Sequence, residues 1–165
     1  MATSRAKKEE TLSELAIAFK NGASATFVSF GGVNVASSTD LRRSLNAENV
    51  SYQVAKKTLI AKAVSEGGFS GEMPALPGNI AVTVSQNDPT ASARVLYNWF
   101  KDKKEVKDLF TIVGGIYEGK LMSAAEMQAI ATIPDIKTLR GMFVNIINSP
   151  IQRVVTVLSK IAEVK

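Results

Sequence analysis

The chain has 165 residues, enough for one domain with a sizeable core and a short appendage. It contains no cysteine and no histidine, which excludes disulfides, thiolate or imidazole catalysis and the commonest zinc ligands. Twenty basic residues against fifteen acidic ones give a net charge of +5, and the carboxylates and lysines form no catalytic motif. The glycine-rich segment 67–78 lacks the GxxxxGK(S/T) pattern of a phosphate-binding loop. The sequence therefore predicts a protein that is not an enzyme and binds no metal or cofactor.

The excess of positive charge is uneven along the chain. Residues 1–63 hold nine Lys or Arg and five Asp or Glu, residues 64–133 hold six and eight, and residues 134–165 hold five and two. The three segments therefore carry net charges of +4, −2 and +3. This distribution favours a polyanion at the N-terminal end and an acidic partner at the tail, although ordinary solvated lysines also give such a balance.

The first half of the chain alternates helices with strands. It predicts helices over 4–21, 35–46 and 56–64 and strands over 25–30 and 50–54. Ser4 is a suitable N-cap for the first helix, and Gly22 ends it. The strand over 50–54 alternates apolar and polar residues strictly, as one side of a sheet requires. A loop rich in glycine and proline follows over 67–79.

The second half continues the alternation with strands over 80–84 and 109–113 and a helix over 88–101. Asp88 and Pro89 match the N-cap and the first position of that helix. Ser123 and Glu126 form a capping box that opens the next helix. Pro134 ends it, and the remaining residues are predicted to be helical, with an interruption or kink at Pro150.

The order of elements doubles a strand–helix–strand unit, with a short helix between the two halves. This order predicts a ferredoxin-like α+β domain with helices packed on one face of a small antiparallel sheet. A doubly wound parallel sheet is the competing topology, but four short strands make a poor parallel core. We therefore expect a globular domain over 1–133 and a C-terminal helical extension over 134–165.

Basic side chains gather on the predicted helices of the first 63 residues. Such side chains contact phosphates and position an RNA without reading much of its sequence. Tyr52 is the only aromatic ring nearby, so structured RNA recognised by shape is favoured over stacked single strands. The candidate contacts among them are Arg5, Lys7, Lys8, Arg42, Arg43, Lys56, Lys57 and Lys62.

The last twenty-four residues, 142–165, are largely apolar, and one stripe of them steps by four, four, three, four and three positions along a helix. The flanks of the stripe are apolar too, so contact with one domain would leave much of the helix exposed. Burying about eight of these side chains at ~1.5–3 kcal/mol each gives on the order of ten kcal/mol or more. The sequence therefore predicts a docking helix. Its candidate contacts are Phe143, Ile147, Ile151, Val154, Val155, Leu158 and Ile161.

The same pattern also occurs in a core helix, a self-associating helix and a membrane-surface helix. Pro134 and Pro150 set the helix apart from the domain, which disfavours the core helix. The tail has no Trp and no broad polar face, and the chain has no stretch near eighteen apolar residues, so no membrane contact is expected. Blocks 141–150 and 151–160 have similar content, which suggests two equivalent docking sites.

Several motifs, in their order and spacing, resemble one known family over essentially the whole chain. They are Leu-Arg-Arg-Ser-Leu at 41–45, Val-Ser-Tyr-Gln-Val-Ala-Lys-Lys-Thr-Leu at 50–59, Asp88-Pro89 with its alanine-rich helix, Gly-Gly-Ile-Tyr-Glu-Gly at 114–119, the Ser123 capping box and Ile133-Pro134. With these motifs the chain resembles the bacterial ribosomal protein L ten family, the scaffold at the base of the large-subunit stalk.

The resemblance implies a cytoplasmic, ribosomal and non-catalytic protein. Its globular domain would bind large-subunit rRNA beside ribosomal protein L eleven. Its tail would carry dimers of the acidic stalk protein L seven/twelve, which recruit translation factor GTPases, and its length leaves room for about two dimers. The alternative is an RNA-binding protein outside the ribosome that forms a homo-oligomer through its tail.

Matching positions also imply which residues contact the rRNA. The implied contacts are Arg42, Arg43, Lys56, Lys57 and Thr58, with Lys7 and Lys8 beside them. Two positions depart from the family pattern. Lys57 stands where the family commonly has Asn, and Gly78-Asn79-Ile80 stands where it has Gly-Pro-Thr.

Overall fold

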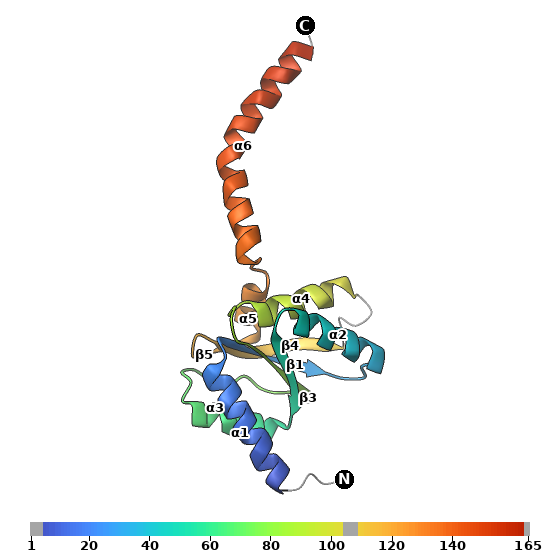
Figure 1. Cartoon of the computed structure of the whole chain (residues 1–165), viewed down its shortest axis with the longest axis vertical. Helices are drawn as coiled ribbons and strands as arrows, with labels where there is room; N and C mark the ends of the chain where they lie inside the picture. Colours follow the sequence, from blue (N-terminus) through green and yellow to red (C-terminus); the bar gives the residue numbers. More distant parts are fainter. Residues whose placement is uncertain (1–4, 104–108, 164–165) are drawn as a thin grey trace. The chain divides into compact units, whose positions relative to one another are not determined.

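The computed structural model describes residues 5–103 and 109–163, so the predicted N-cap Ser4 lies outside the described residues. The chain divides into two compact units, Met1–Ile133 and Pro134–Lys165, which we call the globular unit and the tail. The tail contains α6 (Ile136–Glu163). The elements of the globular unit are α1 (Arg5–Asn21), β1 (Ser24–Phe30), α2 (Val35–Ala47), β2 (Val50–Ala55), α3 (Lys57–Gly67), β3 (Asn79–Ser85), α4 (Ala91–Asp102), β4 (Phe110–Tyr117), β5 (Lys120–Ser123) and α5 (Ala124–Ala131) (Figure 1).

The five strands form one sheet in the order β2-β3-β1-β4-β5, and every neighbouring pair is antiparallel. β1 lies in the middle, where Phe27 pairs with Val82 of β3 and with Gly114 of β4. The order of the first four strands is that of a ferredoxin-like fold, in which the two strand–helix–strand units interleave. The predicted α+β fold is confirmed, and the parallel alternative is wrong.

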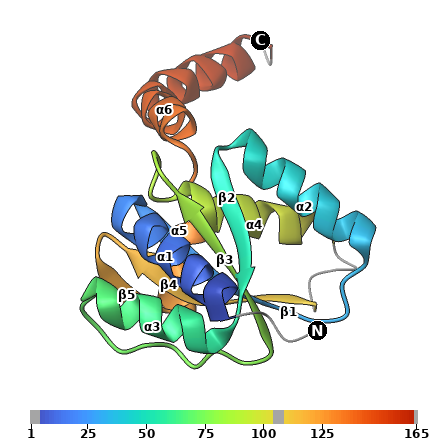
Figure 2. The ribbon, with the colours of Figure 1, turned by 60° about the horizontal axis from the view of Figure 1, so that its bottom comes forward.

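Helices cover both faces of this sheet, whereas the sequence predicted one. Successive side chains of a strand point to opposite faces, so Phe27 and Val28 of β1 belong to different clusters. Phe27 packs with residues of α1 and α3, and Val28 packs with residues of α2 and α4 (Figure 2). The apolar stripe of a helix shows that it is buried but not which face of the sheet it meets, which is why the sequence missed the second layer.

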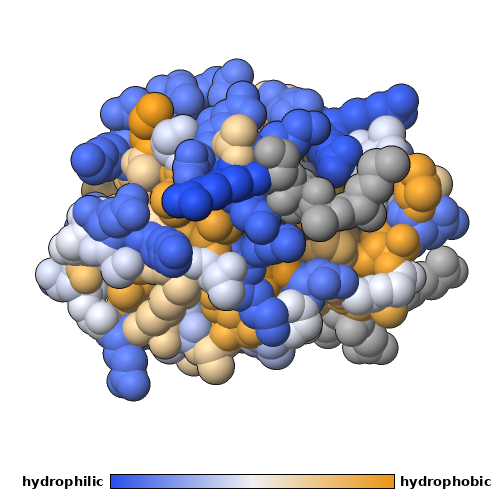
Figure 3. All heavy atoms as spheres, turned by 90° about the horizontal axis from the view of Figure 1, so that it is seen from below, coloured by the Kyte–Doolittle hydropathy of each residue, from blue (hydrophilic) through white to orange (hydrophobic). Residues whose placement is uncertain are grey.

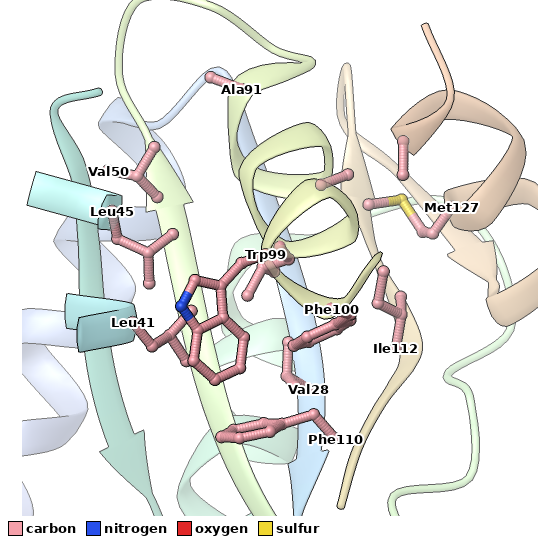
Figure 4. Close-up of a cluster of buried hydrophobic side chains, with 13 residues drawn as sticks. Val28, Leu41, Leu45, Val50, Ala91, Trp99, Phe100, Phe110, Ile112 and Met127 are labelled. Carbon is pink, nitrogen blue, oxygen red and sulfur yellow. The ribbon is translucent and has the colours of Figure 1, made fainter. Parts of the chain in front are cut away.

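Aromatic rings hold the α4 side of the sheet together (Figure 4). The rings of Trp99 and Phe110 meet edge to face with their centroids 5.4 Å apart, and Phe100 stacks on Phe110 at 5.5 Å. Each such pair adds about 0.5–1.5 kcal/mol beyond the area it buries. The stack fixes the start of β4 against β1, at the end of the sheet where β1 finishes.

β4 runs beyond residue 113, the predicted end of this strand, and passes through two glycines, Gly114 and Gly115. Gly115 pairs with Thr26 of β1, and a Cβ at this glycine would collide with the carbonyl oxygen of Ala25 and with the side chain of Met127. The glycine therefore allows close packing instead of ending the strand. Beyond it the chain turns back into β5, a short edge strand that was not predicted.

The predicted capping box at the start of α5 is present. The Glu126 carboxylate accepts hydrogen bonds from the backbone N–H of Ser123 at 2.8 Å and from its hydroxyl at 2.9 Å. The backbone hydrogen bond, followed by that of the hydroxyl, lowers the pKa of Glu126. This cap fixes the start of α5 directly after the last residue of strand β5.

α4 begins at Ala91 rather than at Pro89, because the Asp88 segment forms a turn of its own. The Asp88 carboxylate accepts hydrogen bonds from the Thr90 backbone N–H at 2.9 Å and hydroxyl at 2.8 Å, and pairs with Arg94 at 3.0 Å. Partial burial raises the pKa of Asp88, but the hydrogen bonds from Thr90 and the charge of Arg94 outweigh it and hold the pKa below its usual value.

We expect Asp88→Ala to lower the free energy of unfolding by about 1–2 kcal/mol at neutral pH, because α4 loses its turn and Arg94 loses its partner. The pKa of Asp88 is lower in the folded state than in the unfolded one. The ionised Asp88 carboxylate therefore contributes its full stabilisation of the folded state above the unfolded pKa, and this stabilisation is lost as the pH falls through the folded pKa. Urea unfolding at several pH values should show that the difference in free energy of unfolding between the variant and the unchanged chain becomes smaller in acid. A difference independent of pH would contradict the ionic part of this account.

α6 is one helix through Pro150 and is not interrupted there. Figure 1 shows the ribbon bent near its middle, where Pro150 lies, as expected when a proline removes a backbone hydrogen bond. Among residues 5–103 and 109–163, no helix has both the length and the apolar character needed to cross a membrane.

Candidate nucleic-acid interface and docking helix

Basic residues lie on both sides of the β2 edge of the sheet. β2 is one of the two edge strands, with α2 packed on one face of the sheet and α3 on the other (Figure 2). α2 carries Arg42 and Arg43, and Lys56 and Lys57 stand where β2 passes into α3. All four side chains are exposed. The fold therefore places two basic pairs that are separate in the sequence on the two sides of one edge strand, and we call these four residues the basic edge.

Arg42 is held against the sheet by an aromatic ring. Its guanidinium carbon lies 5.4 Å from the centre of the Tyr52 ring, a cation–π distance. Burial raises the pKa of the Tyr52 hydroxyl, and the nearby charge of Arg42 opposes that shift to a smaller extent. The one ring that the sequence offered for base stacking is thus half-buried and already has an arginine over it.

A surface hollow of about 610 Å³ opens where α3 begins, and we call it the α3 hollow. It lies where β1 ends, β3 begins and β2 passes into α3. Ser29 donates a hydrogen bond to the carbonyl oxygen of Pro77 at 3.0 Å and so ties the segment before β3 to β1. The lining residues are Phe30, Val54, Ala55, Lys56, Lys57, Thr58, Gly78, Asn79 and Ile80.

The α3 hollow brings together the two segments that the resemblance marked as departures, an expectation from the sequence. Lys57 and the Gly78–Ile80 segment are distant in sequence yet line the same depression. Gly78 has a φ of 65°, a left-handed conformation that suits glycine. The basic pattern of the sequence and the family resemblance pointed to Lys57 and Thr58, whereas no sequence signal placed Phe30, Val54 and Asn79 beside them. The strand pairings bring them together: Phe30 of β1 pairs with Asn79 of β3, and Val54 of β2 pairs with Ala81 of β3.

The remaining predicted RNA contacts belong to the layer formed by α1 and α3. These helices pack side by side and begin at the same end of the layer (Figures 1 and 2). Lys7 and Lys8 are exposed near the start of α1, and Lys62 is exposed on α3. Figure 3 views the globular unit from this side and shows strongly hydrophilic side chains across it, with apolar side chains visible between them.

All seven predicted docking residues of α6 are exposed, from 57% for Val155 to 65% for Phe143. Apolar residues outside the predicted stripe are exposed as well, among them Val144 at 64% and Ile146 at 70%. An exposed apolar surface of this extent is typical of a protein contact site. The remaining five docking residues are Ile147, Ile151, Val154, Leu158 and Ile161.

The charged side chains of α6 are mostly basic. Lys137 and Arg140 are exposed before Pro150, and Arg153 and Lys160 are exposed after it. Each half of the helix thus combines an apolar face with two basic side chains. This combination suits a partner that offers an apolar groove with acidic residues at its rim.

Comparison with known proteins agrees with the motifs. The family described as Ribosomal protein L10 matches residues 3–101. The large ribosomal subunit protein uL10 of Shouchella clausii is 31% identical over 159 residues, which cover 96% of this chain and 93% of that protein. The protein of the same name from Thermotoga neapolitana is 34% identical over 161 residues, covering 95% of this chain and 89% of the relative.

A further protein of this name, from Symbiobacterium thermophilum, is 35% identical over 154 residues, which cover 93% of this chain and 85% of the relative. These relatives match 93% to 96% of the chain, and they confirm the resemblance that the motifs indicated. The chain belongs to the ribosomal protein L10 family and is therefore a structural, non-enzymatic component of the large ribosomal subunit in the cytoplasm.

Proposed function

We propose that the globular unit binds large-subunit rRNA and that α6 carries dimers of the acidic stalk protein L seven/twelve, with ribosomal protein L eleven nearby. The observation that supports this most is the separation of two surfaces with different chemistry. Exposed basic side chains flank one edge of the globular unit, whereas exposed apolar side chains run the length of a helix in a separate unit. A polyanion suits the first surface, and a protein groove suits the second.

The basic edge is the centre of the proposed rRNA contact. Arg42 and Arg43 extend from one side of β2, and Lys56, Lys57 and Thr58 lie on the other, so an RNA lying along β2 meets cations from both sides. Arginine and lysine side chains contact phosphates and fix the register of a nucleic acid. Lys7, Lys8 and Lys62 extend the same charge over the α1–α3 layer.

Replacing both arginines tests this proposal. We expect Arg42→Ala with Arg43→Ala to weaken binding to refolded large-subunit rRNA and to reduce the slope of log affinity against log salt by roughly 0.9 for each lost phosphate contact on duplex-like RNA. A matched control, Lys137→Ala with Arg140→Ala, removes the same charge from α6 and should leave affinity and slope unchanged. If the two double variants behave alike, net charge and not the basic edge governs binding.

The length of α6 supports two docked dimers. Its 28 residues extend roughly 40 Å at 1.5 Å per residue, and Pro150 divides them into two segments of about four turns each. Each segment presents apolar side chains and two basic ones. A segment of this length is what a helix-in-groove contact uses, so one dimer on each half is the simplest arrangement.

A further inference from the structure

We propose that the α3 hollow binds a single unstacked base of the RNA that the basic edge holds. The inference rests on the proposed rRNA function and adds to it a site that reads one nucleotide. Phosphate contacts position a nucleic acid, whereas a base in a pocket gives sequence information. The hollow has the composition of such a pocket: an apolar floor, one aromatic ring, a side-chain amide and cations at the rim.

The floor of the hollow is an uncovered corner of the sheet. Phe30 and Val54 lie an even number of residues after Val28 and Val50, so all four point to the same face. Val28 and Val50 are buried in the core cluster with α2 and α4, but Val54 is 47% exposed and Phe30 is only half-buried. The helices therefore leave an apolar patch open at this end of the sheet.

The ring of Phe30 is held in place by the aromatic rings of the core. It lies 6.3 Å from the ring of Phe110, and Phe110 is stacked on Phe100 at 5.5 Å. Phe110 and Phe100 are buried, so this row of rings is fixed by the core. A ring held in this way loses little freedom when a base stacks on it, which favours binding.

Polar groups at the rim match the rest of a nucleotide. Lys56, Lys57 and Thr58 line one side, where ammonium and hydroxyl groups can meet phosphate and ribose oxygens. Asn79 lines the hollow as well, and its amide can both donate and accept hydrogen bonds at the edge of a base.

The charge of the rim argues for a base and against an apolar side chain from a protein. Every nucleotide brings its own negative charge to the two lysines, whereas a peptide would match them only if acidic residues flanked its apolar anchor. A volume of about 610 Å³ is within the range of small-molecule sites and holds a base. Tyr52 has Arg42 over its ring, so Phe30 is the ring available for stacking at this edge.

The test compares two replacements of Phe30 in the full-length chain, with refolded, protein-free large-subunit rRNA as the probe. Phe30→Leu keeps an apolar side chain but removes the ring, and we expect about tenfold weaker binding. Phe30→Tyr keeps the ring and should bind like the unchanged chain. Stacking releases no counterions, so the salt slope should be the same in all three proteins. Equal affinity of the Leu and Tyr variants would overturn the proposal.

A second variant fills the hollow instead of emptying it. Val54→Trp adds a large side chain at a half-exposed position on an edge strand, where aromatic residues are tolerated, and should weaken binding about tenfold by excluding the base. The control is Ile17→Trp on α1, which is 60% exposed and should bind normally. Normal binding by the Val54 variant would overturn the base site alone. Failure of the unchanged chain to bind the rRNA would overturn the proposed function as well.

Discussion

A chain with Val154→Asp and Leu158→Asp is expected to lose its stalk-protein dimers while its rRNA affinity stays the same. The two side chains are 60% and 61% exposed and lie one helical turn apart on the apolar stripe of α6. A carboxylate buried without a partner in an apolar contact costs several kcal/mol, so two of them should weaken docking more than a hundredfold. Since neither side chain is buried in the folded chain, the fold should be unaffected.

Native mass spectrometry of the protein purified gently from its own cells measures the result. The unchanged chain should carry four copies of one small acidic protein, which correspond to two dimers. The matched control, Gln152→Asp with Thr156→Asp, adds the same charges at exposed polar positions with the same spacing and should keep all four copies. A third dimer would contradict the two-site arrangement, and a mass that is a multiple of this chain alone would show self-association instead.

We expect Phe27→Ala to destabilise the globular unit by about 3–5 kcal/mol, a large part of the 5–15 kcal/mol typical of a domain. Phe27 is fully buried in the central strand and meets Phe19 of α1 edge to face at 6.2 Å. Its loss opens a cavity between the sheet and the α1–α3 layer. Urea unfolding should show a lower midpoint with a similar slope. The control is Ile17→Ala on α1, the helix that carries Phe19. Because Ile17 is 60% exposed, this change should alter the free energy of unfolding by less than about 0.5 kcal/mol.

Much of the fold followed from local patterns. The alternation over 50–54 and the capping box at Ser123 each report a short-range preference, and the structure contains a strand at the first and the cap at the second, although Val54 at the end of the strand is exposed. What the sequence could not supply depends on contacts between distant residues. Gly115 reads as a strand breaker until the carbonyl oxygen of Ala25 is seen against it, and the burial of α1 does not say which face of the sheet it covers.

The candidate site shows the same division. Charge and helix position correctly predicted that Arg42 and Lys57 lie on the surface. The family resemblance, which the comparisons confirm, correctly predicted a non-catalytic ribosomal protein. Membership of that family disfavours the alternative of an RNA-binding protein outside the ribosome. The hollow could not be predicted without the strand register, because Phe30 and Asn79 are far apart in sequence and meet only as a pair between β1 and β3. The assignment of individual residues to rRNA and stalk contacts stays a prediction.

The position of β2 has a consequence for the protein before it reaches its RNA. An outermost strand offers unpaired backbone groups to any other strand, which makes it a starting point for aggregation. Charged side chains beside such a strand oppose pairing. Two copies meeting edge to edge would bring the positive charges of Arg42, Arg43, Lys56 and Lys57 in one copy close to the same charges in the other. Repulsion between newly made copies thus protects the same edge that the negative charge of RNA later covers.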